Sequence, residues 1–200
     1  MNVRWATATI LAAMGLAPCA QAQDAGEWIV RAGFHSLQPE SHNHALVEVE
    51  DTTGLTFNVT YMFARNWGVE LFGGLPFLHE IRLEGAGAVG EMDLLPPTLS
   101  VQYHFNPNGR ARPYIGAGLN YTLFSDERTW GAMQGMKLAL DPSVGPAAQL
   151  GIDVNVLPGW FVNIDARWFD VDTDAKLDGV HRGTVEIDPY AFGVTVGHRF

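Results

Sequence analysis

Apolar and polar residues alternate with a period of two along most of this 200-residue chain. In the stretch 114–124, for example, every second residue from Ile115 to Leu123 is apolar. Successive side chains of a β-strand point to opposite faces, so this pattern predicts strands with one apolar face. Eight segments of this kind are present. They are 28–35, 55–63, 67–77, 98–105, 114–124, 146–156, 160–169 and 188–200.

The connections between these segments alternate in length. The short ones are 64–66, 106–111 and 157–159, and the long polar ones lie near 39–53, 78–93, 125–143 and 170–184. An even number of strands, with short turns at one end and long loops at the other, is typical of bacterial outer-membrane barrels. The sequence therefore predicts an all-β fold, an eight-stranded antiparallel up-and-down transmembrane β-barrel with short periplasmic turns and long extracellular loops.

A soluble β-sandwich would show the same alternation, with its apolar face turned inward. Composition is compatible with the barrel: only 17% of the residues are charged, against roughly 25% in an ordinary soluble domain, and the strands of a membrane barrel are only half apolar. The net charge of −10 argues against a nucleic-acid partner, which needs a basic face. Large aromatic residues also gather beside the short turns or the chain termini, as expected at a membrane interface. They are Trp28, Phe63, Trp67, Phe105, Trp160 and Phe200.

The N-terminus has the features of a secretory signal peptide. Arg4 supplies a positive charge, residues 5–17 are apolar, and residues 20–22 match an A-x-A cleavage site. We expect residues 1–22 to be removed on export, and residues 23–200 to form the barrel in a Gram-negative outer membrane. The alternative is an amphipathic helix that stays attached to the chain.

Several blocks of the sequence resemble the outer-membrane protein W (OmpW) family, which includes alkane-import barrels of the AlkL type. They include TGLTFNVTYMFARNWGVELFGGLPF at 53–77, LLPPTLSVQYHF at 94–105, RPYIGAGLNYT at 112–122 and WFVNIDARWFDVDT at 160–173. The resemblance covers nearly all of the chain after the leader. It implies an eight-stranded barrel whose narrow lumen passes small hydrophobic molecules across the outer membrane. The alternative function is a structural or surface-recognition barrel without transport.

The resemblance also implies a constriction inside the lumen. In the OmpW family it is apolar and is set by inward side chains of the third and seventh strands, which correspond here to Phe72 and Arg167. Phe72 fits an apolar gate, whereas Arg167 departs from it. The alternation places further charged residues on the inward face, namely Arg31, Glu70, Asp153 and Asp165. Because buried charges must be paired, we expect either a structural ion-pair plug or a network that closes the periplasmic half and redirects an apolar solute sideways.

Prolines mark a candidate seam in the barrel wall. Pro76 lies near the outer end of the third segment, and Pro96 and Pro97 lie near the outer end of the fourth. Proline donates no backbone N–H to a β-ladder, so pairing is weak at the same height on both strands. The hypothesis is a lateral opening to the bilayer. The alternative is that these prolines simply end their strands at the loop boundary.

Two further features concern the ends of the barrel. Apolar residues spaced three or four apart, Trp130, Met133, Met136 and Leu140, predict a short amphipathic helix over the mouth. The last strand ends on the aromatic Phe200, which resembles the signal read by the outer-membrane assembly machinery. The expected partners are therefore the lipid bilayer, small apolar solutes and the barrel assembly machinery.

The remaining motifs do not indicate catalysis or cofactor binding. The stretch 85–90 matches G-x-G-x-x-G but lies in a polar loop without a βαβ unit. Ser100 and His104 are four residues apart on one strand, roughly 13 Å, which is too far for a nucleophile and its base. His42 and His44 offer only a weak surface metal pattern. We expect no catalytic, cofactor or metal site.

Overall fold

The eight predicted segments form a closed antiparallel barrel in the computed structural model, which describes residues 24–39, 47–49, 51–83, 85 and 87–200. In order around the barrel, the strands are β1 (Trp28–Gln38), β3 (Thr52–Ala64), β4 (Trp67–Gly74), β7 (Thr98–His104), β8 (Ala111–Thr129), β10 (Ser143–Leu157), β11 (Trp160–Phe169) and β14 (Tyr190–Arg199). The predicted barrel fold is confirmed. The predicted signal peptide, residues 1–22, lies outside the described residues.

The barrel closes where its first and last strands meet. β1 pairs with β14 from Ile29 opposite Arg199 to Gln38 opposite Tyr190. At the end of this ladder, Trp28 and Phe200 exchange two backbone hydrogen bonds of 3.2 and 2.9 Å. Each barrel strand thus pairs with a neighbour on both sides, and such lateral pairing satisfies backbone groups as the interior of a bilayer requires. In the described part of the chain, no helix is long and apolar enough to cross a membrane.

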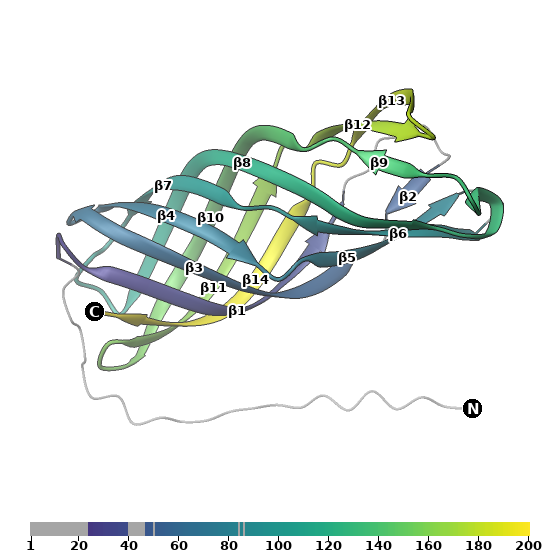
Figure 1. The fold of residues 1–200 in the computed structure, drawn as a ribbon. Coiled ribbons are helices and arrows are strands. Elements are labelled where there is room, and N and C mark those ends of the chain that lie inside the picture. Colours follow the sequence, from purple (N-terminus) through teal and green to yellow (C-terminus); the bar gives the residue numbers. More distant parts are fainter. Residues whose placement is uncertain (1–23, 40–46, 50, 84, 86) are drawn as a thin grey trace, which may run out of the picture.

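The apolar face of every barrel strand points outward. Phe34, Leu119 and Val194, each about 60% exposed, are typical of the outer wall. Polar and charged side chains point into the lumen instead, which is the reverse of a soluble β-sandwich. The six aromatic residues predicted at an interface are all exposed, and each lies beside a short turn or at an end of the strand order. Figure 1 shows the short-turn end opposite the end formed by the long hairpins.

The interior accommodates large side chains because glycines lie opposite them on neighbouring strands. The ring of Phe161 lies against Gly197, and the imidazole of His35 lies against Gly193. A Cβ added at Gly151 would lie 2.6 Å from the Tyr114 hydroxyl oxygen. Alternating large and small inward residues is how a narrow barrel fills its lumen.

Much of the sequence predicted as long polar loops continues the β-structure beyond the barrel wall. β5 (Phe77–Leu83) and β6 (Gly87–Leu95) form one hairpin, which pairs with β8 and with β2 (Val47–Val49). β12 (Asp172–Leu177) and β13 (Val180–Glu186) form another, which pairs with β9 (Leu138–Leu140) in a separate three-stranded sheet. These extensions form the long-hairpin end in Figure 1.

The prediction of an amphipathic helix over the mouth is wrong. The stretch that contains Trp130 and Met133 forms only the 3₁₀ turn η1 (Gly131–Met133), and Leu140 belongs to β9. Gly131 and Gly135 have positive φ angles of 55° and 83°. Such angles interrupt a right-handed helix, so the apolar side chains are held by β-pairing and a tight turn instead.

Candidate solute pathway in the barrel lumen

Charged side chains from four strands form an ion-pair layer across the lumen, in the half nearer the short turns. The layer consists of Arg31, Glu70, Asp153, Asp165 and Arg167, which are at most 3% exposed. Arg167 Nη1 donates to Glu70 Oε1 at 2.7 Å, and Arg167 Nε donates to Asp165 Oδ1 at 3.1 Å. Arg31 Nη2 donates to Asp153 Oδ2 at 2.9 Å and lies beside Glu70, with a 3.7 Å separation from Arg31 Nη1 to Glu70 Oε2. The structure thus brings all five sequence-predicted charges together.

Further polar side chains bond to the carboxylates of the layer. Gln102 and Gln149 donate to the two oxygens of Glu70 at 2.8 and 3.0 Å. Asn163 donates to Asp153 at 2.9 Å. His35 joins Asp165 through Nε2 at 2.9 Å, while its Nδ1 contacts the Thr56 hydroxyl at 2.6 Å. A buried charge is tolerated only with such partners, so the layer is a bonded unit rather than an aqueous pore lining.

Arg199 extends the layer toward the short-turn end, and the sequence reasoning did not include it. Its Nη2 donates to Asp153 at 3.0 Å, and its Nη1 donates to Asn155 at 2.6 Å. The guanidinium also lies 4.3 Å from the centre of the Phe161 ring. The alternation placed Arg199 on the inward face, which was the signal available in the sequence. Arg199 lies on β14, which pairs with β1 to close the barrel, so its side chain helps to fill the lumen beside that strand pair.

The two residues predicted at the constriction, Phe72 and Arg167, are in direct contact. The Arg167 guanidinium lies over the Phe72 ring, 4.1 Å from its centre. The same ring stacks on Phe169 at 6.2 Å and meets His35 edge-on at 5.2 Å. A cation held over an aromatic face is attracted by the ring quadrupole. Phe72 therefore covers the ion-pair layer with an apolar surface on its outer side.

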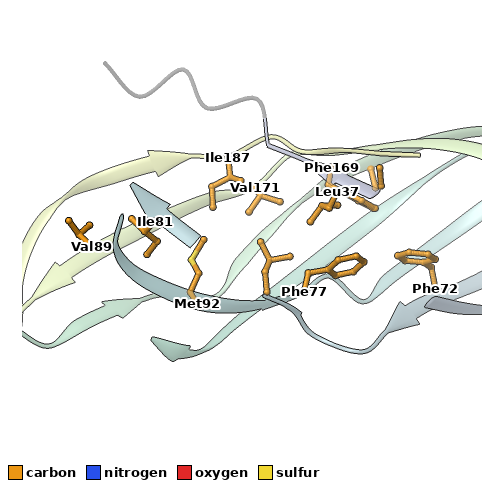
Figure 2. Packing of buried hydrophobic residues seen from close by; sticks show 12 residues of the cluster. Leu37, Phe72, Phe77, Ile81, Val89, Met92, Phe169, Val171 and Ile187 are labelled. Carbon is orange, nitrogen blue, oxygen red and sulfur yellow. The ribbon is translucent and has the colours of Figure 1, made fainter. Parts of the chain in front are cut away.

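Above Phe72 most of the buried side chains are apolar. Twelve of them pack into one group, which we call the apolar cluster. They are Leu37, Phe72, Phe77, Ile81, Val89, Met92, Leu94, Ala147, Phe169, Val171, Ile187 and Ala191. Figure 2 shows these side chains packed between the strands, with Phe72 and Val89 at opposite ends of the cluster. Phe72 and Arg167 thus mark the boundary between the apolar and the charged part of the lumen.

The predicted proline seam lies where the barrel's backbone ladder is interrupted. β4 and β7 pair as far as Phe72 opposite Thr98, and β5 and β6 resume pairing at Phe77 opposite Leu94. Between them lie residues 73–76 and 95–97, which include all three prolines and which we call the ladder gap. In the ladder gap, the backbone forms hydrogen bonds with the flanking strands β3 and β8 instead. Leu75 N donates to Leu55 O, and Tyr121 N donates to Pro97 O, each at 2.9 Å.

A shallow groove lies on the bilayer-facing wall beside the ladder gap. Its volume is about 430 Å³, and its walls come mainly from β4, β7 and β8. The residues that line it are Leu71, Pro97, Thr98, Leu99, Leu119, Asn120, Tyr121 and Val144. The ladder gap therefore has the apolar cluster on its inner side and an apolar groove on its outer side.

The histidine and serine side chains that we considered as catalytic candidates have other contacts. His104 Nε2 contacts Gln102 Oε1 at 2.9 Å, and its ring stacks on Tyr114 at 5.2 Å. Ser100 lies in the lumen wall opposite Glu70. His42 and His44 lie outside the described residues. The buried polar groups of the lumen thus serve the packing and bonding of the layer.

Comparisons with known proteins agree with this architecture. A model of the OmpW family matches residues 24–200. Outer membrane protein W of Vibrio cholerae serotype O1 is 37% identical over 209 aligned positions, covering 96% of each chain. Outer membrane protein AlkL of Ectopseudomonas oleovorans is 32% identical over 164 positions, covering 78% of this chain and 70% of that protein. The crystal structure of OprG from Pseudomonas aeruginosa matches with a TM-score of 0.81 at 31% identity, covering 90% of this chain and 98% of that one.

Proposed function

Because this chain belongs to the OmpW family of outer-membrane proteins, we propose that it passes small hydrophobic molecules through the outer membrane and releases them sideways into the bilayer. The protein is an outer-membrane β-barrel embedded in lipid, and like its family it is not an enzyme. The solute class and the sideways release are the proposal. Its similarity to AlkL supports the solute class.

The observation that carries the proposal is the apolar cluster placed directly on the ion-pair layer. A hydrocarbon gains roughly 0.8 kcal/mol for each CH₂ group that it removes from water, so these apolar side chains favour such a solute over a polar one. The layer beneath offers only charges that are already paired. An apolar solute cannot replace those bonds, and separating a buried ion pair is costly. A route along the barrel axis is therefore unfavourable for the solute that the apolar cluster favours.

The ladder gap supplies an alternative route at the right height. It begins directly after Phe72, where the apolar cluster meets the ion-pair layer, and it lacks the backbone pairing that closes the wall elsewhere. Opening it costs fewer hydrogen bonds than opening any fully paired stretch, since Pro76, Pro96 and Pro97 have no N–H to donate. A solute leaving there would meet the apolar groove and the lipid beyond it.

Uptake by cells with an intact outer membrane tests the transport proposal. We expect octane to enter faster with the barrel than without it, while glucose entry stays unchanged. Phe72→Trp should slow octane entry, because the larger ring fills more of the lumen where the apolar cluster meets the ion-pair layer. Phe57→Trp is the matched control, because Phe57 faces the bilayer and is 53% exposed. Equal acceleration of octane and glucose would indicate a polar pore and contradict the proposal.

A surface-recognition barrel is the second candidate, and the ordered long-hairpin end favours it. β9, β12 and β13 form a sheet of their own beyond the barrel wall, which is a stable surface for a binding partner. The discriminating result is a barrel that accelerates neither solute yet keeps a cell-surface binding phenotype in the Phe72→Trp variant. Recognition does not depend on the lumen, so blocking it would leave that phenotype intact.

A further inference from the structure

We propose that the groove on the bilayer-facing wall is a docking site for one acyl chain of an outer-leaflet lipid. The groove lies beside the ladder gap and has a volume of about 430 Å³. This inference goes beyond the proposed function, because a lipid chain would occupy the groove whether or not a solute leaves the barrel there.

Two rows of outward-facing residues form the walls of the groove. The lower row, nearer the short turns, consists of three leucines that are cross-strand partners on β4, β7 and β8, namely Leu71, Leu99 and Leu119. The upper row continues from the ladder gap across β8 to β10 and consists of Pro97, Tyr121 and Val144. Apart from the half-buried Pro97, all of these side chains are exposed to the bilayer. The groove therefore lies between two apolar ridges.

The floor between the two rows is formed mainly by backbone. Thr98 and Asn120 are cross-strand partners that come between the rows, and their side chains are only 2% and 1% exposed. Both side chains point into the lumen, where Asn120 Nδ2 donates to Thr98 Oγ1 at 3.0 Å. Outward-facing side chains thus border the floor on both sides but do not cover it.

The polar groups beside the floor already have hydrogen-bond partners. Pro97 O accepts from Tyr121 N at 2.9 Å, and Pro96 O accepts from the Thr98 hydroxyl at 3.0 Å. The two prolines have no backbone N–H to leave unpaired. Hydrocarbon can cover such a floor without burying an unpaired polar group, whereas a polar ligand would lose its own hydrogen bonds to water there. The chemistry of the groove therefore selects a hydrocarbon chain.

The height of the groove places it in the outer leaflet. Above Tyr121 on β8, the next outward residues are Leu123 and then the exposed polar Ser125, which is roughly 13 Å away along the strand. Below Leu119, β8 extends to Ala111, roughly 27 Å away toward the short turns. The hydrocarbon core of a bilayer is about 30 Å thick and barrel strands are tilted across it. The groove is therefore level with the acyl chains of the extracellular leaflet, below their headgroups.

A lipid chain is the occupant that the surroundings of this wall supply. The groove is continuous with the lipid-facing surface of an outer-membrane barrel. A hollow left empty would forfeit the dispersion contacts of the side chains that line it. On the convex wall elsewhere, a chain touches the protein on one side only, whereas in the groove it touches two ridges and a floor. Packing of this kind is what holds apolar surfaces together inside a bilayer, so a chain in the groove should exchange more slowly than other boundary lipid.

Partial filling of the groove tests this inference. Val144→Trp introduces a large ring into the upper row at a position that is 69% exposed. Val194→Trp is the matched control, because Val194 is 60% exposed on β14 and does not line the groove. Tyr121→Ala is a second test variant, since it removes part of one wall instead of filling the space. Folded barrel, identified by its mobility without heating, is compared in each case.

The first readout locates the chain. The barrel is reconstituted in vesicles of dimyristoylphosphatidylcholine that contain a small fraction of the same lipid with a nitroxide at the end of one acyl chain. Paramagnetic relaxation is measured at the methyl groups of Leu119 in the groove and of Leu150, which is similarly exposed on β10 outside it. Val144→Trp and Tyr121→Ala should each lower the relaxation rate at Leu119 several-fold and leave Leu150 unchanged. Val194→Trp should change neither rate.

The second readout is stoichiometry. Native mass spectrometry of the barrel in detergent with added dimyristoylphosphatidylcholine should show one retained phospholipid in the parent and in Val194→Trp. The retained fraction should fall several-fold in Val144→Trp. This measurement involves no solute, so a barrel that never accelerates octane entry could still confirm the docking site.

Two results would overturn the inference. Equal relaxation at Leu119 in the parent and in both groove variants would show that the groove holds lipid no differently from the rest of the wall. Relaxation at Leu119 well below that at Leu150, together with efficient disulfide formation between two Leu99→Cys barrels, would show that a second copy of the chain covers the groove instead of a lipid.

Discussion

At the scale of single residues, Arg167 connects the two halves of the lumen. It binds Glu70 and Asp165 below and covers the Phe72 ring above. Arg167→Met would leave two buried carboxylates without their main partner. We expect the free energy of unfolding to fall by about 3–5 kcal/mol, as when one member of a buried ion pair is removed. Urea unfolding of the barrel in lipid vesicles measures this change.

The matched control for Arg167 is Arg128, which forms an ion pair with Glu91 at 3.0 Å in the long-hairpin end. The Arg128 side chain is 68% exposed, so Arg128→Met should change the free energy of unfolding by less than about 1 kcal/mol. Similar decreases in the free energy of unfolding of the two variants would show that the lumen ion pairs contribute no more to stability than a surface pair does.

Asp172 provides a pH-dependent prediction outside the membrane. Burial raises the pKa of its carboxyl above 3.8, and the negative charges of Asp170, Asp188 and Glu186 add to the effect. The carboxylates of Asp170, Asp172 and Asp188 lie within 4.8 Å of one another. An acid with a raised pKa favours the folded state when protonated, so its contribution to stability is lost as the pH rises from about 4 through the raised pKa.

Asp172→Asn removes that ionisation. We expect the melting temperature of this variant to exceed that of the parent by about 1–2 °C at pH 7 and to equal it at pH 3.5. Asp51→Asn, at an exposed position outside the cluster, should show no such pH-dependent difference. A higher melting temperature at both pH values would mean that charge repulsion is not the cause.

The positions of the lumen residues could be predicted from the sequence, but their partners could not. A period of two is enough to place Arg31 and Glu70 on the inward face. Their proximity to Asp153 depends on the stagger between strands that are distant around the barrel, which a single strand's pattern does not contain. Arg199 was missed for the same reason, because only closure of the barrel brings it to Asp153.

At the scale of strands, prediction succeeded where one face of a strand meets lipid. Those strands need an apolar face, so their alternation is strong and their existence was predicted in all eight cases. The hairpins beyond the wall have water on one side and a small apolar core on the other, so their pattern is weaker. Residues 78–83 and 180–184, which belong to β5 and β13, were consequently predicted as polar loop.

The ladder gap gives a prediction at this scale. Leu75, which is 57% exposed, lies on one segment of the gap, and the half-buried Leu95 lies on the other. Joining Leu75→Cys and Leu95→Cys with a short thiol-specific cross-linker should fix the two segments together and slow octane uptake. Reversal of the cross-link should restore it. The reason is that lateral exit needs these segments to separate, whereas a route along the axis does not.

The control cross-link joins Leu150→Cys and Ala166→Cys, which are paired in register on the outer face of β10 and β11. This part of the wall is already closed by backbone hydrogen bonds, so uptake should not change. Unchanged uptake after cross-linking the gap would contradict the lateral route and favour passage along the lumen.

At the scale of the whole molecule, Phe200 contributes to the barrel through its backbone and through its ring. The backbone of Phe200 forms both hydrogen bonds with Trp28 that end the closing ladder. Its side chain is 72% exposed at the short-turn end, where it adds to the aromatic belt and is presented to the membrane. Phe200→Ala separates these roles, because it retains the backbone bonds and removes only the ring.

We predict that Phe200→Ala lowers the amount of folded barrel in the outer membrane several-fold, while purified chain refolds into lipid vesicles with the parent's yield. The ring would then act on assembly in the cell rather than on the stability of the closed barrel. Phe105→Ala is the control, since Phe105 is an exposed aromatic residue at the same end but not at the terminus. Equal losses for the two variants in cells would assign the effect to the aromatic belt. If Phe200→Ala also lowered the refolding yield in vesicles, the effect would be assigned to closure of the barrel, because refolding in vesicles involves no assembly machinery.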